Sequence, residues 1–463
     1  MAGTARRRRR KSPDEREEAV ETNGARVDIG TSQQTDEKLE ALQRNAFAYF
    51  LKGANPHNGL IADNTREDAH SSIAATGLGL AAYVVGVERG FITRGDAIER
   101  TLTTLRFFDR SAQSEDPNAT GYQGFYYHFL DMKSGRRAWD CELSVIDTAL
   151  LIAGALASMI YFEGDRDGEP EIRRLVAALY ERINWAWAMN DGPTVSMGWK
   201  PRCGFLRYGW EGYSEASLLY VLGLGSPTHP LSPGSYAAWT STYQWENLYG
   251  YDVLFAAPLF IHQLSYVWID FRGIQDAFMR EKRSDYFENS RRATYIQQHY
   301  AIRNPKRLKG YHKHCWGITS GDGPGFAQQC VEGVERHFFG YGARGIPYGP
   351  DDGTLAPWAA IASLPFAPEV VLPSVQHVLD TYPEITNGSG GLSSFNPTFS
   401  VGDDATRGWV CDARYGLDQG PVVLMIENYR SGLLWRLMRR CRVMVAGLRR
   451  AGFRNGWLNS TEG

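Results

Sequence analysis

The sequence has few cysteines, almost no net charge and no long apolar run. Its six cysteines include no C-x-x-C pair, which argues against a zinc knuckle, a redox motif or a disulfide framework. The net charge of −2 provides no overall basic field for nucleic acid. No run of about 18 apolar residues is free of charges and turn residues. We therefore expect neither a nucleic-acid partner nor a membrane span.

Aromatic residues, by contrast, are abundant. They make up 13% of the chain and include 13 Trp and 24 Tyr. These side chains would fill a large core, but their flat apolar faces also suit a cleft that binds sugar rings. The hydrophobic content of 43% and the charged content of 22% are typical of a globular protein. Composition alone leaves both interpretations of the aromatic residues open.

The first 34 residues differ in composition from the rest of the chain. A basic block at residues 6–11 is followed by an acidic region at residues 14–18, a pattern typical of a disordered, solvated tail. No apolar stretch of signal-peptide length follows the arginines. This favours a cytoplasmic location, or a periplasmic or secreted one if the start is misassigned. Residues 35–455 contain no linker, and we expect them to form a single domain.

After the tail, apolar residues recur at helical spacing. Segments that are apolar all round, such as 71–88, 149–162 and 249–268, alternate with amphipathic segments, such as 93–110 and 284–302. The alternation predicts buried inner helices surrounded by amphipathic outer helices. We therefore expect an all-α fold of the α/α toroid type, with long loops and small β-hairpins.

Carboxylates recur where the predicted helices start. Asp140, Glu142 and Asp147 stand at the start of the apolar helix, and Ser144 and Asp147 have the spacing of an N-cap pair. The favourable interaction of acids with a helix N-terminus would explain them without any chemistry. It does not explain why most such acids are flanked by Trp, Tyr or Gly. The other acids in such settings are Glu211, Glu215, Asp351, Asp352 and Asp418.

Glycoside hydrolysis requires two carboxyl groups across a sugar-sized cleft, one protonated and one ionised. An apolar setting raises the pKa of the acid. Trp139 beside Glu142, or Trp210 and Tyr213 near Glu215, would supply such a setting. A helix N-terminus instead lowers the pKa and suits the ionised partner. The sequence leaves open which effect dominates at each carboxylate.

Two histidine-containing segments have different interpretations. His229 lies in a proline-rich loop after the segment that Glu215 opens, which favours a position at the edge of a sugar-binding site. The segment from His312 to Cys315 has a spacing that suits zinc poorly. We therefore expect no metal and no other cofactor.

Four segments together resemble the glycoamylase-like domain family. They are residues 142–155, 213–230, 348–357 and 415–430, and they occur in order across nearly the whole chain. The family includes bacterial endo-β-1,2-glucanases of glycoside hydrolase family 144, and a related domain is the transglycosylase of cyclic β-1,2-glucan synthases. The resemblance implies an (α/α)6 barrel with small β-hairpins at a cleft for β-1,2-linked glucan, and no metal.

The resemblance also implies a function and a site. We expect a glycoside hydrolase that cleaves β-glucan, foremost β-1,2-glucan, so the partner is an oligo- or polysaccharide. The alternatives are a transglycosylase, an exo-acting enzyme that releases disaccharides, and a glycan-binding protein without activity. The expected catalytic residues, whose acid and base roles stay open, are Glu142, Glu215, Asp147 and Asp418. The expected substrate-binding residues are Asp140, Trp210, Tyr213, His229, Asp352 and Tyr415.

Overall fold

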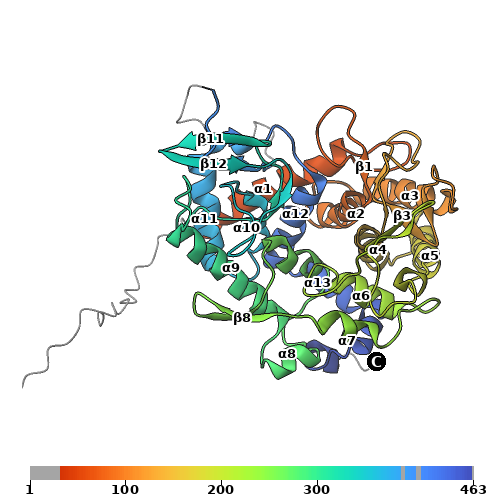
Figure 1. Ribbon diagram of the computed structural model, residues 1–463. Helices are drawn as coiled ribbons and strands as arrows, with labels where there is room; N and C mark the ends of the chain where they lie inside the picture. The colour runs from red at the N-terminus through yellow and green to blue at the C-terminus, as the bar shows by residue number, and fades with distance from the viewer. Residues whose placement is uncertain (1–31, 387–391, 403–407, 461–463) are drawn as a thin grey trace, which may run out of the picture.

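Helices dominate the computed structural model, which describes residues 32–386, 392–402 and 408–460 (Figure 1). Most of the predicted N-terminal tail lies outside the described residues, and the first helix already begins at Ser32. The helices are α1 (Ser32–Lys52), α2 (Ile73–Glu88), α3 (Arg94–Arg110), α4 (Val145–Tyr161), α5 (Glu169–Glu181), α6 (Ser217–Gly225), α7 (Ser235–Thr240), α8 (Ala277–Glu281), α9 (Tyr286–Arg303), α10 (Pro357–Ala362), α11 (Pro368–Thr381), α12 (Gly416–Arg430), α13 (Leu433–Arg439) and α14 (Arg442–Arg450).

The buried helices pack side by side. α2 contacts α4 and α12, α4 also contacts α6, and α10 contacts α12. Almost all residues of these helices are buried. The helices α1, α3, α5, α11 and α14 cover them from outside, each against at least one buried helix. The predicted alternation of inner and outer helices is thus observed among these elements.

Glycines let α2 and α4 approach closely. A Cβ atom added at Gly77 of α2 would lie 2.4 Å from the Leu150 carbonyl oxygen of α4. One added at Gly154 would lie 1.8 Å from the Gly77 carbonyl oxygen. Both distances are shorter than van der Waals contact, so the two helix backbones can meet only through glycine.

The apolar segment at residues 249–268 corrects a prediction, because it forms no α-helix. It contains strand β9 (Tyr251–Leu254) and the short 3₁₀ helices η2 (Leu259–His262) and η3 (Leu264–Val267). The Gln263 side chain donates to the Ala359 carbonyl and the Ser363 hydroxyl of α10. Pro258, which has no N–H to donate, precedes η2. The hydrogen bonds to α10 and the proline therefore accompany short 3₁₀ turns in place of one continuous helix.

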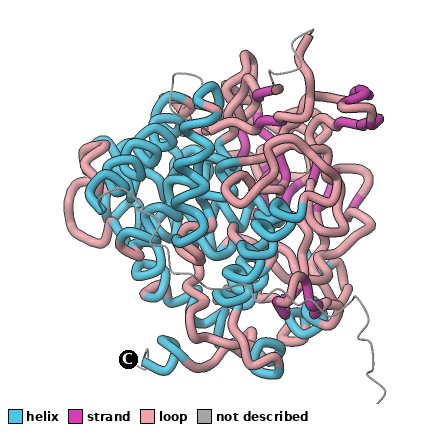
Figure 2. Tube along the Cα trace, turned by 90° about the vertical axis from the view of Figure 1, so that its left-hand side faces the viewer, coloured by secondary structure: helices cyan, strands magenta, loops and turns pink. Residues whose placement is uncertain are grey.

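The strands are short and antiparallel, and two of them directly precede buried helices. β1 leads into α2 and β5 leads into α4. Figure 2 shows the helices gathered on one side and most of the strands and long loops on the other. The largest sheet has the order β2-β3-β5-β6-β7. The remaining strands are β1 (Ser71–Ser72), β2 (Gly121–Tyr122), β3 (Phe125–Tyr127), β4 (Phe129–Leu130), β5 (Leu143–Ser144), β6 (Gly198–Lys200), β7 (Gly204–Phe205), β8 (Trp245–Leu248), β10 (Ser320–Gly321), β11 (Ala327–Val331), β12 (Val334–Phe338), β13 (Gly342–Ala343), β14 (Phe395–Asn396) and β15 (Trp409–Val410). The other 3₁₀ helices are η1 (Trp187–Met189), η4 (Pro383–Thr386) and η5 (Gly456–Ser460).

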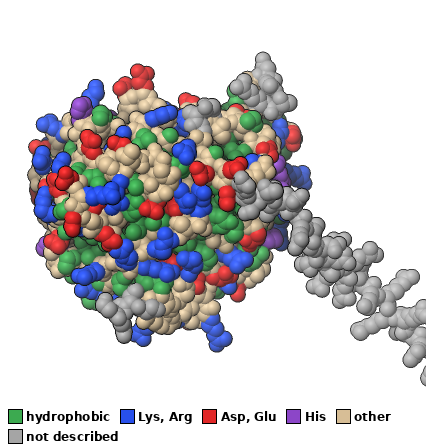
Figure 3. Space-filling model, turned by 180° about the vertical axis from the view of Figure 1, so that it is seen from behind, with side chains coloured by type: hydrophobic (Ala, Val, Ile, Leu, Met, Phe, Trp, Pro, Cys, Tyr) green, Lys and Arg blue, Asp and Glu red, His purple; other side chains and the backbone are tan. Residues whose placement is uncertain are grey.

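The surface agrees with the balanced composition. On the face in Figure 3, basic and acidic side chains are interspersed. All six cysteines are free thiols. Within the described ranges, no helix combines the length and apolarity needed to span a bilayer.

Candidate active site

Acidic side chains from separate segments meet where the buried helices begin. Asp147 lies in the first turn of α4, Asp418 lies in the first turn of α12, and Glu215 directly precedes α6. Asp63 precedes β1, and its carbonyl accepts a hydrogen bond from the Gly416 amide at the start of α12. We refer to Asp63, Glu142, Asp147, Glu215 and Asp418 as the carboxylate cluster.

His128 connects two members of the cluster. Its Nδ1 lies 2.9 Å from Oε1 of Glu142, and its Nε2 lies 3.5 Å from Oδ2 of Asp147. Burial alone would lower the pKa of His128, but Asp147, Glu142 and Asp63 outweigh it and raise the pKa to about 9. Near neutral pH the ring is therefore an imidazolium that donates to Glu142 and lies within ion-pair distance of Asp147.

Glu142 is kept ionised by its surroundings. The hydrogen bond from His128 is the main cause that lowers the pKa of Glu142, against the opposing effect of burial. The register of β3, β5 and β6 brings these groups together, because Leu143 pairs with Tyr127 on one side and with Trp199 on the other. Glu142 is thereby placed between His128 and Lys200, whose charge also lowers its pKa.

Asp147 combines a helix cap with a place in the cluster. Ser144, the N-cap of α4, accepts a hydrogen bond from the Asp147 amide at 3.2 Å and donates its hydroxyl to the Asp147 carboxylate. The predicted N-cap pair is thus confirmed. The Asp147 carboxylate also lies within ion-pair distance of His128, a contact that capping does not require.

Glu215 lies in the setting expected of a carboxylic acid. Burial is the main cause that raises its pKa to about 7, and the charge of Asp147 adds to the effect. No ion pair to Glu215 occurs among the described residues. Ser265 of η3 donates its hydroxyl to the Glu215 carbonyl and accepts from the Leu218 amide. It therefore fixes the turn before α6, where Ala216 at the N-cap cannot cap the helix.

Asp418 and Asp63 form a second protonatable part of the cluster. Burial, followed by the charges of Asp63 and Asp322, raises the pKa of Asp418 well above its usual value. Burial also raises the pKa of Asp63. Burial, followed by the charges of Asp418, Asp63 and Asp147, raises the pKa of Tyr341 to about 12.

The segment that carries Tyr415 is tied to two other segments at the edge of the cluster. The Tyr415 hydroxyl donates to Asp322 at 2.8 Å and accepts from Arg66 at 2.7 Å. Arg66 also bonds to Asp322 at 2.8 Å and to Asp412 at 2.9 Å. These contacts hold the loop after Asp63 against the start of α12.

Asp352 belongs to a buried ion pair. Its carboxylate pairs with the Arg344 guanidinium at 2.7 Å, and both side chains are buried. Arg344 also donates to the Gly321 carbonyl and to the carbonyls of Phe339 and Gly340. The pair therefore supports the two loops that carry Asp322 and Tyr341.

The other predicted residues lie outside the cluster. Asp140 is exposed and pairs with Arg137 at 2.8 Å. Trp210 is buried, and the buried Tyr213 hydroxyl lies 2.6 Å from that of Tyr266. His229 is exposed beyond the C-terminal end of α6, whereas Glu215 precedes its N-terminal end. The structure thus brings together the four expected catalytic residues and Tyr415. Asp140, Trp210, Tyr213 and His229, which were expected to bind substrate, lie apart from them.

Several residues of the site carry no local sequence signal. His128 lies between β3 and β4, and only the strand register brings it to Glu142. Asp63, Arg66 and Asp322 lie in loops, and Ser265 lies in a segment predicted to be helical. Among the described residues, no group of three or more His, Cys, Asp or Glu side chains is arranged to hold a metal ion.

Comparisons with known proteins define the family. The family model named Glycoamylase, described as "Putative glucoamylase", matches residues 207–442, just over half of the chain. The chain belongs to this glycoamylase family, which confirms the membership predicted from the four segments.

Individual relatives are similar over most of this chain. An exo β-1,2-glucooligosaccharide sophorohydrolase (non-reducing end) from Parabacteroides distasonis is 30% identical over 448 residues. The match covers 89% of this chain but only 57% of that relative. The structure of an endo-β-1,2-glucanase from Chitinophaga pinensis is 26% identical, with a TM-score of 0.80 over 91% of this chain and 99% of that chain. The structure of a β-1,2-glucanase from Parabacteroides distasonis is 27% identical, with a TM-score of 0.78 over 90% of this chain and 60% of that chain.

Proposed function

We propose that this protein is a glycoside hydrolase that cleaves β-1,2-glucan. The observation that carries the proposal is the contrast inside the cluster. Glu215 has a pKa raised to about 7 and can donate a proton, whereas the hydrogen bond from His128 lowers the pKa of Glu142 and keeps it ionised. Glycoside hydrolysis uses such a pair of protonated and ionised carboxyl groups. The relatives named as β-1,2-glucanases support the choice of linkage.

In this mechanism Glu215 protonates the oxygen of the leaving sugar. An ionised carboxylate of the cluster acts on the other side of the bond, as base towards water or as nucleophile. Glu142, which His128 keeps ionised, is the first candidate for this role, and Asp147 lies at the other nitrogen of the same ring. The raised pKa of Asp418 suits it to hold a proton instead. His128 does not itself touch the reacting atoms, but its hydrogen bond lowers the pKa of Glu142, and its other nitrogen lies 3.5 Å from the Asp147 carboxylate.

The fold expected from the resemblance belongs to the same proposal. We propose that α2, α4, α6, α10 and α12 are five inner positions of an (α/α)6 barrel, and that the segment with η2 and η3 fills the sixth. Ser265 joins this segment to the start of α6, and Gln263 joins it to α10. α1 and α12 are also linked, because Gln43 donates to Val423 and Glu427. These links support closure and a single domain over residues 35–455.

An exo-acting enzyme that releases disaccharides is the second candidate. It is favoured by the sophorohydrolase that is 30% identical to this chain. Both candidates use the same carboxylates, and the sizes of the products separate them. The cellular compartment stays a prediction from the sequence.

The decisive experiment incubates the purified protein with linear β-1,2-glucan, beside β-1,3-glucan, β-1,4-glucan and starch. We expect short oligosaccharides from β-1,2-glucan alone, with only disaccharide indicating exo action. Glu215→Gln keeps the shape of the side chain but removes the proton, so turnover should fall by about 10²- to 10⁴-fold. No product from any polymer would contradict the hydrolase and favour transglycosylation or binding without turnover.

A further inference from the structure

Trp139 is unusual among the tryptophans of this protein. All thirteen lie in the described ranges, and it is the one that is mostly exposed, at 69%. Its backbone has φ of 52°, in the left-handed region that a bulky side chain rarely adopts. Unfavourable backbone geometry of this kind persists where the surrounding structure enforces it. The exposed indole and the enforced left-handed backbone together distinguish Trp139 from an ordinary surface aromatic.

The turn that carries Trp139 is firmly braced. The largely buried Arg137 side chain donates to the Cys141 carbonyl at 2.7 Å and to the Asp140 carboxylate at 2.8 Å. The Arg137 guanidinium also lies over the Tyr127 ring, 4.8 Å from its centre. The Ala138 amide donates to the Phe129 carbonyl at 2.9 Å. The indole is therefore presented by a fixed turn.

Trp139 also lies next to the carboxylate cluster. Its ring meets the edge of His70 at 4.5 Å and of Phe129 at 5.1 Å, measured between ring centres. Phe129 stacks on His128 at 4.0 Å, and the His70 carbonyl accepts the amide of Asp63. One aromatic ring thus separates Trp139 from the imidazole that holds Glu142. The indole therefore borders the carboxylate cluster without contacting its carboxylates through these rings.

We propose that Trp139 is a stacking platform for a glucose unit of the glucan, outside the pair of units joined by the bond that breaks. The inference rests on the proposed function for the identity of the sugar. The C–H face of a glucose ring is apolar and flat, and the exposed indole offers a matching surface. The platform would favour chains long enough to reach it.

The test measures binding of β-1,2-glucooligosaccharides of increasing length by calorimetry, in the Glu215→Gln protein so that the ligand is not consumed. Adding Trp139→Ala should weaken binding of the longer chains by about 2- to 10-fold, the size of an aromatic stacking contact. The shortest chains should bind equally well. Trp139→Tyr should restore most of the affinity, because a flat ring returns.

The matched control is Tyr429→Ala, an exposed aromatic at the C-terminal end of α12, the end opposite Asp418. It should leave every affinity unchanged. Equal affinities for the Trp139→Ala protein and its parent at all lengths, or no binding by the parent, would overturn the platform. If oligosaccharides bind with the expected dependence on Trp139 but the wild-type protein cleaves none, the hydrolase proposal fails and the platform stands.

Discussion

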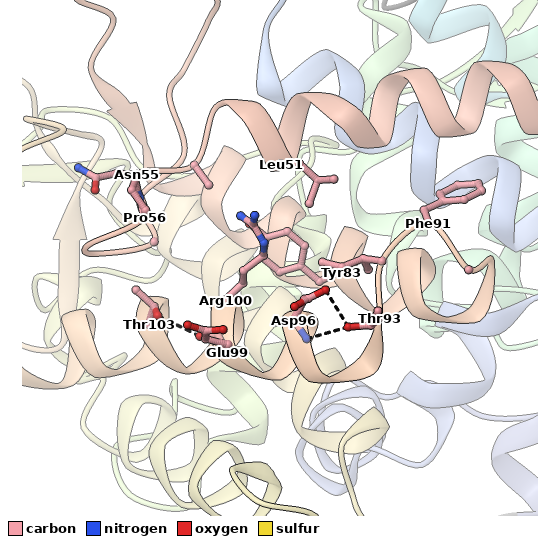
Figure 4. A pocket seen from close by; sticks show the side chains of 14 residues that line it. Leu51, Asn55, Pro56, Tyr83, Phe91, Thr93, Asp96, Glu99, Arg100 and Thr103 are labelled. Carbon is pink, nitrogen blue, oxygen red and sulfur yellow. Dashed lines mark hydrogen bonds between the residues drawn. The ribbon is translucent and has the colours of Figure 1, made fainter.

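The helices α3 and α4 begin with the same local chemistry. At α4, Ser144 accepts from the Asp147 amide and donates to the Asp147 carboxylate. At α3, Thr93 accepts from the Asp96 amide at 3.1 Å and donates to the Asp96 carboxylate at 2.7 Å. The second pair lines a pocket of about 710 Å³ beside α1 (Figure 4). Both pairs satisfy amides that the first turn of a helix leaves without partners.

The surroundings of the two pairs differ. Asp147 is only 8% exposed and lies near His128 and Glu215, which come from other segments. Asp96 is exposed, and among the residues that the structure describes it forms no ion pair. The charged groups nearest to it in Figure 4, Glu99 and Arg100, come from α3 itself. We therefore expect a capping acid to take part in catalysis only where the fold brings other titratable groups close to it.

The largest expected difference is between Asp147→Asn and Asp96→Asn. Each substitution keeps an oxygen that accepts from the capping hydroxyl and removes one negative charge. We expect the first to lower kcat on β-1,2-glucan by about 10²-fold or more, because the cluster loses a carboxylate that lies beside His128. The second should leave kcat unchanged and alter stability by less than about 0.5 kcal/mol. Equal losses of activity would show that the surroundings do not distinguish the two acids.

A smaller effect is expected when His128 is replaced by Gln. Wild-type activity should fall as the pH rises through about 7, because Glu215 then loses the proton that it must donate. The acid side of the profile requires an ionised Glu142, whose pKa is lowered by His128. Removing the imidazolium raises the pKa of Glu142. The acid limb of the pH profile of His128→Gln should therefore shift to higher pH, whereas the alkaline limb, which reports Glu215, should not shift.

The measurement is the pH dependence of kcat/KM, with thermal unfolding to verify that the His128→Gln protein is folded. A loss of activity by the same factor at every pH would contradict the electrostatic role. It would leave His128 as a packing residue between the two carboxylates.

Features that depend on neighbouring residues in the chain were predictable. The apolar pattern of α4, the Ser144–Asp147 cap and the family segments that carry Glu215 and Asp418 are all local. The family is confirmed by the comparisons. The catalytic roles remain predictions, although the structure places Glu142, Asp147, Glu215 and Asp418 together.

Features that depend on distant contacts were not predictable. His128 reaches Glu142 only through strand register, and Ser265 reaches Glu215 only because its segment breaks into short 3₁₀ turns. Tyr213 is an aromatic neighbour of Glu215 in sequence, yet its hydroxyl bonds inside the core. At Glu215 itself the helix dipole and burial oppose each other, and burial dominates once the surrounding elements are in place. None of these contacts, and not the balance at Glu215, can be calculated from spacing along the chain.

The smallest expected effect is that of removing either of the two capping hydroxyls, Thr93 or Ser144. Thr93→Ala and Ser144→Ala should each lower the free energy of unfolding by about 1 kcal/mol, the usual cost of losing an N-cap. Only Ser144→Ala should also lower kcat, because Ser144 additionally orients the Asp147 carboxylate beside His128. Denaturant unfolding and steady-state kinetics on the same preparations separate the two effects. If Thr93→Ala lowered kcat as much as Ser144→Ala, the Thr93–Asp96 pair would be more than a cap, and the pocket in Figure 4 would contribute to activity.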